Sequence, residues 1–323
     1  LSPTVTHDTS LPSYIKTNTV GKTEPSYAVL KFMESFCLIS AACGMVGNGM
    51  VLWYLGFRIR RNHFTVYILN LAAADFGYLF CIAIETVQYL MQFNVGVQFG
   101  IFLFLDLFMY GTGLYLLTAI SIERCLSVLC PIWCRSHRPK HLSAIISGLL
   151  WGISLLLNTL GYVLCSVHRS AGTCQILLIT IGTLDFIFCT PLMLLFSLTL
   201  FLRVKCSSHH LRTGRLFTVI MLTVLFFLIF AVPLSILILF DFLGYKFLYS
   251  PEIGFVLSCV NSTLNPIIYF LVGSYKDRRI KFTLRLAFQR AFEDSESPMP
   301  EGIPMESTGS RGGPLGSFLR DLG

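Results

Sequence analysis

Hydrophobic residues along this chain gather into seven long runs, which short polar segments separate. A transmembrane helix needs about 20 mostly apolar residues to cross a bilayer, and each run reaches that length. The pattern predicts an all-α membrane protein: a seven-transmembrane helix bundle with a short amphipathic helix after the seventh span. The predicted spans are residues 30–57, 65–91, 99–130, 142–164, 174–202, 216–243 and 250–273.

The predicted bundle, residues 30–273, lies between two polar tails. Residues 1–29 are rich in Ser, Thr and Pro, and residues 293–323 are acidic and then rich in Gly, Pro and Ser, so both tails are expected to be disordered. Residues 274–292 favour an amphipathic helix on the inner membrane surface, and a solvated basic tail is the alternative. Their apolar positions recur at i, i+4, i+7 and i+8, at Ile280, Leu284, Ala287 and Phe288.

Charged residues make up only 13% of the 323 residues, whereas a soluble domain has about 25%, which supports a membrane protein. Most of the 24 lysines and arginines follow the first, third, fifth and seventh runs. Because cytoplasmic loops carry the excess of Lys and Arg, the N-terminus is expected to be extracellular and the C-terminus cytoplasmic. The inner loops therefore explain the net charge of +7. The lipid bilayer is the expected partner of this chain, and no nucleic acid is expected.

The third run carries charges at both ends. Asp106 lies near its start, and Glu123 and Arg124 lie near its end. Asp106 and Arg124 are separated by about five helical turns and about 27 Å, so both fall on one helix face. Charges inside a membrane cost roughly 2.5–3.5 kcal/mol each on insertion scales, and they mark function or a buried partner. We expect Glu123 and Arg124 to form an ion pair, and this helix to couple the two membrane surfaces.

Other polar or helix-bending residues lie within the apolar runs, where lipid cannot satisfy them. A proline in a transmembrane helix leaves a carbonyl without its donor, and neighbouring polar groups must supply one. We expect Asp75, Asn48 and Asn265 to pair with one another. The remaining members of this set are Trp151, Pro191, Pro233, Asn261, Ser262, Pro266 and Tyr269.

Together these residues resemble the rhodopsin-like G protein-coupled receptors over residues 32–292. The motifs of that class are Leu71-Ala-Ala-Ala-Asp75, Glu123-Arg-Cys125 and Asn265-Pro-Ile-Ile-Tyr269. Within the class, the chain looks like the Mas-related receptors. The runs that carry this second resemblance are Gly113-Leu-Tyr-Leu-Leu-Thr-Ala-Ile-Ser121, Pro131-Ile-Trp133, His137-Arg-Pro-Lys140 and Val272-Gly-Ser274.

The resemblance implies a plasma-membrane receptor that activates a heterotrimeric G protein of the Gq or Gi type, with arrestin as a further partner and no cofactor. The residues expected to act in G protein coupling and activation are Glu123, Arg124, Ile132, Tyr269, Pro233 and Phe227. Ile132 is expected to fill a hydrophobic pocket on the G protein. Two restraints usual in the class are missing, because Ala231 replaces a tryptophan and no acid lies near Thr213. Ligand-free signalling is therefore expected.

The residues expected to bind the ligand are the acids Asp106, Glu85, Asp185 and Asp241. Asp106 stands where amine receptors of the wider class carry the counterion of an ammonium group. We expect an extracellular cationic ligand, an amine or a basic peptide, that pairs with Asp106 and is assisted by Glu85. Alternatively, Asp106 is protonated or is hydrogen bonded to a nearby hydroxyl such as Tyr110 or Thr112.

The resemblance also implies a disulfide and a sodium pocket. Cys165 and Cys174 flank a short outer loop, and Mas-related receptors pair such cysteines; two free thiols are the alternative. Gly113 stands where a serine usually helps to bind sodium, so no firm metal site is expected. The pocket residues of the class correspond to Asp75, Asn261, Ser262 and Asn265.

A membrane-embedded enzyme or a transporter is the alternative function. A seven-helix zinc hydrolase needs histidine ligands at membrane depth, whereas the seven histidines of this chain fall in tails, loops or span ends. Many transporters show internal repeats and broken helices in corresponding halves, and the seven runs do not repeat one another. The sequence therefore predicts a receptor rather than an enzyme.

Overall fold

The computed structural model describes residues 27–58, 62–91, 96–130, 132, 134, 137–139, 141–168, 187–203, 218–219, 221–230 and 251–274. Within these residues, five helices are long and apolar enough to cross a membrane. Two shorter apolar helices accompany them, Ile187–Arg203 and Met221–Phe230. The long helices are α1 (Tyr27–Trp53), α2 (His63–Leu90), α3 (Gly96–Leu129), α5 (Leu142–His168) and α8 (Pro251–Ser274).

The described helices coincide with the predicted spans, and the long ones begin and end within a few residues of the predicted limits. A π-helical turn, η1 (Tyr54–Arg58), continues α1 and was not predicted from the hydrophobic pattern. The predicted tails and the predicted amphipathic helix fall almost entirely outside the described residues. We use "outer end" for the end of the bundle that carries Asp106, and "inner end" for the end that carries Glu123, after the predicted topology.

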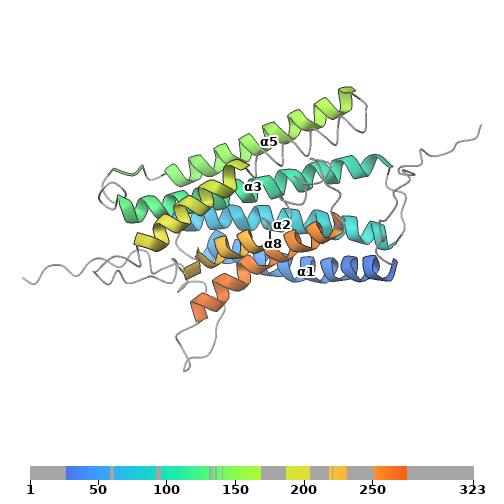
Figure 1. Ribbon diagram of the computed structural model, residues 1–323, viewed down its shortest axis with the longest axis horizontal. Helices are drawn as coiled ribbons and strands as arrows, with labels where there is room; N and C mark the ends of the chain where they lie inside the picture. The colour runs from blue at the N-terminus through green and yellow to red at the C-terminus, as the bar shows by residue number, and fades with distance from the viewer. Residues whose placement is uncertain are drawn as a thin grey trace, which may run out of the picture.

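Helix α2 has a central place among the described helices. Figure 1 shows α2 between α1 and α3, with α5 beyond α3, while α8 packs against both α1 and α2. The start of α2 is fixed by a capping box. The side chain of Asn62 accepts hydrogen bonds from the backbone N–H groups of Phe64 and Thr65 at 3.0 and 2.9 Å, and the Thr65 hydroxyl accepts one from the Asn62 N–H at 2.8 Å. This cap fixes where Phe64 and Tyr67 lie at the inner end.

Helices α1 and α8 approach closely because α1 presents glycines to α8. A Cβ atom at Gly44 would lie 2.6 Å from the Thr263 hydroxyl and 3.2 Å from Thr263 Cα. A Cβ atom at Gly47 would lie 2.8 Å from Pro266 Cγ. The Thr263 hydroxyl donates a hydrogen bond to the Ser40 carbonyl at 3.1 Å. Small residues at this contact therefore let the two helices pack at short range, as is common in membrane bundles.

The same contact resolves a problem that a proline creates in α8. Pro266 has no N–H, so the carbonyl of Ser262, four residues earlier, lacks its helical donor. Asn48 of α1 supplies one, because its Nδ2 lies 3.1 Å from the Ser262 carbonyl oxygen. Asn48 is fully buried, as expected for a group that satisfies a carbonyl inside a membrane.

Candidate functional site

The outer end of the bundle holds a buried acid to which the described residues offer no N–H or hydroxyl donor. Asp106 of α3 is only 4% exposed, and within the described part of the chain neither of its carboxylate oxygens has a hydrogen-bond partner. The carboxyl groups of Asp106 and Glu85 interact across the contact between α3 and α2. The structure thus brings together the two acids that the sequence analysis put first. Because a buried carboxylate is costly unless it is paired, this site is incomplete without a cation or a proton.

Two tyrosines lie beside these acids. The rings of Tyr78 on α2 and Tyr110 on α3 have centroids 5.8 Å apart. The hydroxyl groups of both tyrosines interact with Ser258 of α8. Sequence reasoning missed Tyr78 and Ser258, although Tyr78 lies three residues after Asp75 and so shares a helix face with it.

The hydroxyl groups suggested as partners of Asp106 have other partners. The Thr112 hydroxyl donates to the carbonyl of Phe108 at 2.7 Å, and the Tyr110 hydroxyl interacts with Ser258. The described geometry therefore does not support a hydrogen bond from either hydroxyl to Asp106. A third acid, Glu34 of α1, was also missed; its charge acts on Glu85.

Several predicted site residues fall outside the described part of the chain. They are Asp185, Asp241, Pro233 and Cys174, and Cys165 lies at the end of α5 where only the backbone is described. Their roles in ligand binding, activation and the disulfide stay predictions.

The predicted polar contact in the middle of the bundle is confirmed in part. Asn265 Nδ2 donates to Asp75 Oδ2 at 2.7 Å, as expected. Asn48 does not join this pair, because its amide binds the backbone carbonyls of Gly44 and Ser262 instead. Asn48 thus binds the carbonyl that Pro266 leaves without a donor, and the residue types alone did not predict this contact.

The expected sodium pocket is buried but lacks a ligand from α3. Asp75, Asn261, Ser262 and Asn265 are each 6% exposed or less. A Cβ atom at Gly113 would lie 4.0 Å from Asp75 Oδ1, so α3 faces the pocket with a residue that has no side-chain oxygen. Asn265 also directs its amide N–H groups, rather than its oxygen, at Asp75. The residues present therefore fit a sodium ion incompletely.

At the inner end, the expected ion pair between Glu123 and Arg124 is wrong. Glu123 Oε2 pairs with Arg138 Nη1 at 2.7 Å, and the Tyr67 hydroxyl donates to Glu123 Oε1 at 3.4 Å. Adjacent residues on a helix point in directions about 100° apart and do not face each other. Sequence reasoning used Arg138 as an inner-loop charge and as part of the run His137-Arg-Pro-Lys140, but not as a partner of Glu123, because no spacing rule connects the two residues.

Arg124 is held by an aromatic ring rather than by an acid. Its guanidinium carbon lies 3.0 Å from the centroid of the Phe64 ring, and its Nε and Nη2 atoms are buried without a hydrogen-bond partner. A planar guanidinium stacks well on an aromatic face. The start of α2 therefore covers the residue that the sequence analysis expects to meet a G protein.

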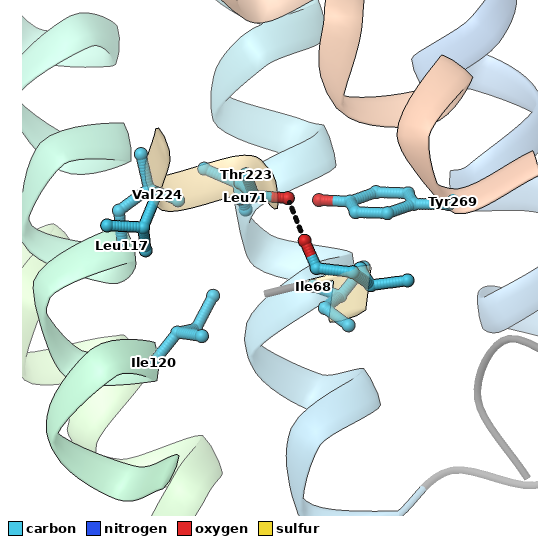
Figure 2. A pocket seen from close by; sticks show the side chains of 8 residues that line it. Ile68, Leu71, Leu117, Ile120, Thr223, Val224 and Tyr269 are labelled. Atoms are coloured by element: carbon cyan, nitrogen blue, oxygen red, sulfur yellow. Dashed lines mark hydrogen bonds between the residues drawn. The ribbon is translucent and has the colours of Figure 1, made fainter. Parts of the chain in front are cut away.

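Phe227 lies within the Met221–Phe230 helix and Tyr269 of α8 lies beside that helix, and each is 2% exposed. Figure 2 shows the Tyr269 hydroxyl pointing at Thr223, with which it interacts. The hydroxyl of Thr223 also donates to the Val219 carbonyl at 2.9 Å. A small apolar cavity opens beside this contact, lined by Ile68, Leu71, Leu117, Ile120, Val219, Thr223, Val224 and Tyr269. Ile132, by contrast, is 80% exposed beyond the inner end of α3.

Comparison with known proteins agrees with this architecture. Residues 47–269 match the family described as 7 transmembrane receptor (rhodopsin family). The chain is 43% identical over 264 residues to Proto-oncogene Mas of Mus musculus, with 79% of this chain and 82% of the relative covered. It is 41% identical over 299 residues to Mas-related G-protein coupled receptor member D of Macaca fascicularis, with 88% and 91% covered. It is 42% identical over 298 residues to Mas-related G-protein coupled receptor member X2 of Homo sapiens, with 84% and 88% covered.

Proposed function

Because this chain belongs to the rhodopsin family of seven-transmembrane receptors, and within it to the Mas-related G protein-coupled receptors, we propose that it binds an extracellular cationic ligand and thereby activates a heterotrimeric G protein. The predicted seven-helix fold and the predicted membrane receptor, rather than an enzyme, are confirmed by this membership. The finer proposal concerns the ligand, the G protein and the orientation in the membrane. It includes coupling to a Gq or Gi type protein, binding of arrestin, and an extracellular N-terminus in the plasma membrane.

The observation that carries the ligand proposal is the Asp106 carboxyl. It is buried without a donor in the described part of the chain, and it lies against the Glu85 carboxyl. An ammonium or guanidinium group placed between these acids would supply the missing charge and donors. The ring of Tyr78 or Tyr110 could lie against the cation, since aromatic faces attract cations.

The inner end supports the activation proposal. Arg124 is covered by Phe64, and Tyr269 is buried against Thr223, so the described arrangement is closed to a G protein. A ligand that binds an open arrangement more tightly would shift a pre-existing equilibrium toward it. Opening requires the helix that contains Met221–Phe230 to move away from α8, which would expose Tyr269, and requires the Phe64 ring to leave Arg124. Ile132 would then contact the G protein.

Substitution of Asp106 tests the ligand proposal. A charge-assisted hydrogen bond contributes about 1.5–3 kcal/mol, so Asp106→Asn should weaken the potency of a cationic agonist by roughly ten- to a hundredfold. The agonist would come from a panel of basic peptides and small amines, measured by nucleotide exchange on Gq and Gi proteins. Glu85→Gln should have a smaller effect, and surface delivery should hardly change. Glu34→Gln on α1 should have the smallest effect of the three, because the charge of Glu34 acts on Glu85 rather than on Asp106. A cationic agonist whose potency survives Asp106→Asn would contradict the proposal.

The orientation has its own test. An epitope tag fused before Leu1 should bind antibody on intact cells, and a tag after Gly323 should bind only after the cells are permeabilised. The reverse pattern would overturn the predicted topology.

A further inference from the structure

Arg138 lies in the segment between α3 and α5, residues 130–141, and binds side chains of both helices. Arg138 Nη1 pairs with Glu123 Oε2 of α3 at 2.7 Å, and Arg138 Nη2 donates to the Ser143 hydroxyl of α5 at 2.7 Å. No more than 10% of either charged side chain is exposed. Figure 1 shows α3 and α5 side by side along their lengths. A single guanidinium therefore joins the end of one helix to the start of the next.

The chemistry of arginine suits this role. The guanidinium is planar and rigid, so two of its nitrogens can bind two acceptors in fixed directions at once. Lysine, with one compact ammonium, would not reproduce both contacts. The Tyr67 hydroxyl donates to Glu123 at 3.4 Å, and the Phe64 ring lies 6.0 Å from the Arg138 guanidinium carbon, so α2 also supports the pair.

The segment that Arg138 fastens also carries Ile132. Beyond the end of α3, the Cys130 N–H donates to the Leu126 carbonyl at 2.8 Å and the Cys134 N–H donates to the Cys130 carbonyl at 3.1 Å. Ile132 is helical and 80% exposed. At the other end of the segment, the Leu142 N–H donates to the Pro139 carbonyl at 3.2 Å.

We propose that Arg138 is a positioning residue for G protein coupling, because it holds this segment so that Ile132 meets the G protein in one orientation. The bridge from Glu123 through Arg138 to Ser143 spans the two ends of the segment, and Ile132 lies between them. The inference rests on the proposed function, since it takes Ile132 as a G protein contact. If Arg138 had a purely structural role, its substitution would destabilise the whole bundle and would not make the segment more mobile than the rest.

Hydrogen exchange decides whether Arg138 positions the segment. The purified full-length receptor in lipid nanodiscs would be compared with Arg138→Gln, Arg138→Lys and Ser143→Ala. Amides of residues 130–142 should exchange about tenfold faster or more in Arg138→Gln, while amides at the centres of α2, α3 and α8 keep their protection. Arg138→Lys and Ser143→Ala each lose one of the two contacts of Arg138, so their exchange rates should lie between those of the natural chain and of Arg138→Gln. Arg58→Gln, which changes an exposed arginine of η1, is the matched control and should change nothing.

A binding measurement then connects the segment with the G protein. Affinity of the same nanodiscs for nucleotide-free Gq and Gi heterotrimers should fall in Arg138→Gln and in Ile132→Ala. The double variant should be no weaker than Ile132→Ala alone, because both changes act through one contact.

The two measurements distinguish a failure of the positioning role of Arg138 from a failure of Ile132 as the G protein contact. Unchanged exchange in residues 130–142 for both Arg138→Gln and Ser143→Ala overturns the positioning role, whatever the affinities are. Faster exchange together with full affinity of Ile132→Ala overturns Ile132 as the G protein contact in the proposed function. Uniformly faster exchange across the bundle assigns Arg138 a structural role only. If Arg138→Gln fails to fold, Ser143→Ala still tests the proposal, because it removes the Arg138–Ser143 hydrogen bond and leaves the ion pair with Glu123 in place.

Discussion

Asn265 of α8 donates a hydrogen bond to the carboxylate of Asp75 on α2 across 2.7 Å, and both side chains are buried. The residue after Asn265 is Pro266, and the carbonyl that this proline frees is bound by Asn48. The part of α8 around Pro266 is thus held by hydrogen bonds from two neighbouring helices.

Asn265→Ala should destabilise the receptor by about 1.5–3 kcal/mol, because it leaves the buried Asp75 carboxylate without its amide donor. Asp75→Asn should also destabilise it, though less. The reciprocal double variant, Asp75→Asn with Asn265→Asp, exchanges donor and acceptor and should recover part of the loss. Thermal unfolding of the purified receptor measures all three. Losses that simply add in the double variant would show that the two side chains do not act as a pair.

Gly113→Ser should make the receptor sensitive to sodium. The serine would place a hydroxyl near Asp75, since a Cβ atom there lies 4.0 Å from Asp75 Oδ1 and 3.8 Å from the Leu71 side chain, which is ordinary contact distance. The measurement compares the unfolding temperature in sodium chloride with that in choline chloride at equal ionic strength. We expect little difference for the natural chain and a clear rise with sodium for Gly113→Ser. Gly113→Ala is the matched control, and an equal response from it would exclude the hydroxyl as the cause.

Phe64→Ala should raise ligand-free signalling. The stacked ring holds Arg124 in the closed arrangement, and a cation–π contact contributes about 0.5–2 kcal/mol, from exposed to desolvated sites, equivalent to about two- to thirtyfold in the equilibrium. Second-messenger levels at matched surface expression test this. Phe57→Ala removes an exposed ring from the same end of the bundle and should have no effect.

In the same assay, Thr213→Glu should lower any basal signal by supplying an acid for Arg124.

Thr223→Val should also favour the open arrangement, because it removes the hydroxyl that faces Tyr269 but keeps the shape of the side chain. The loss of one hydrogen bond corresponds to about 1 kcal/mol, or about fivefold in the equilibrium. Thr118→Val is the control, since this buried threonine of α3 donates to the carbonyl of Leu114 in its own helix. Equal basal signals from both variants would mean that the contact with Tyr269 does not restrain the Met221–Phe230 helix.

Cys165→Ser and Cys174→Ser should each lower surface delivery or agonist response if the two sulfurs form a disulfide. The double variant should then be no worse than either single variant. Flow cytometry of a tagged receptor measures delivery. Additive losses would show that the two cysteines act separately.

Hydrophobic run length was enough to predict the helices, because a membrane helix must satisfy its backbone internally and must reach across the bilayer. The sequence predicted that Asp106 and Glu85 serve the same cationic ligand, and the structure brings their carboxyl groups together. Asp75 and Asn265 were predictable as partners, because a buried carboxylate in a dry bundle needs an amide or hydroxyl at its own level.

The inner end could not be predicted in this way. The partner of Glu123 depends on where Arg138 lies relative to α3, which no helical spacing encodes. The ring over Arg124 depends on the capping box that sets the start of α2, so that a shift of one residue would turn Phe64 away. Asn48 was predicted to bind Asp75 because side-chain patterns do not show that the carbonyl freed by Pro266 also needs a donor. In the structure Asn48 binds that carbonyl instead.

The close contact between α1 and α8 restricts how this receptor can move. The hydrogen bonds described across it include those from Asn48 to Ser262, from Thr263 to Ser40 and from the Cys259 thiol to Cys37, three in all. Separating the helices would break all three at once and would open empty space beside Gly44 and Gly47. We therefore expect α8 to stay against α1 while the Met221–Phe230 helix moves, so that activation leaves the α1–α8 pair unchanged.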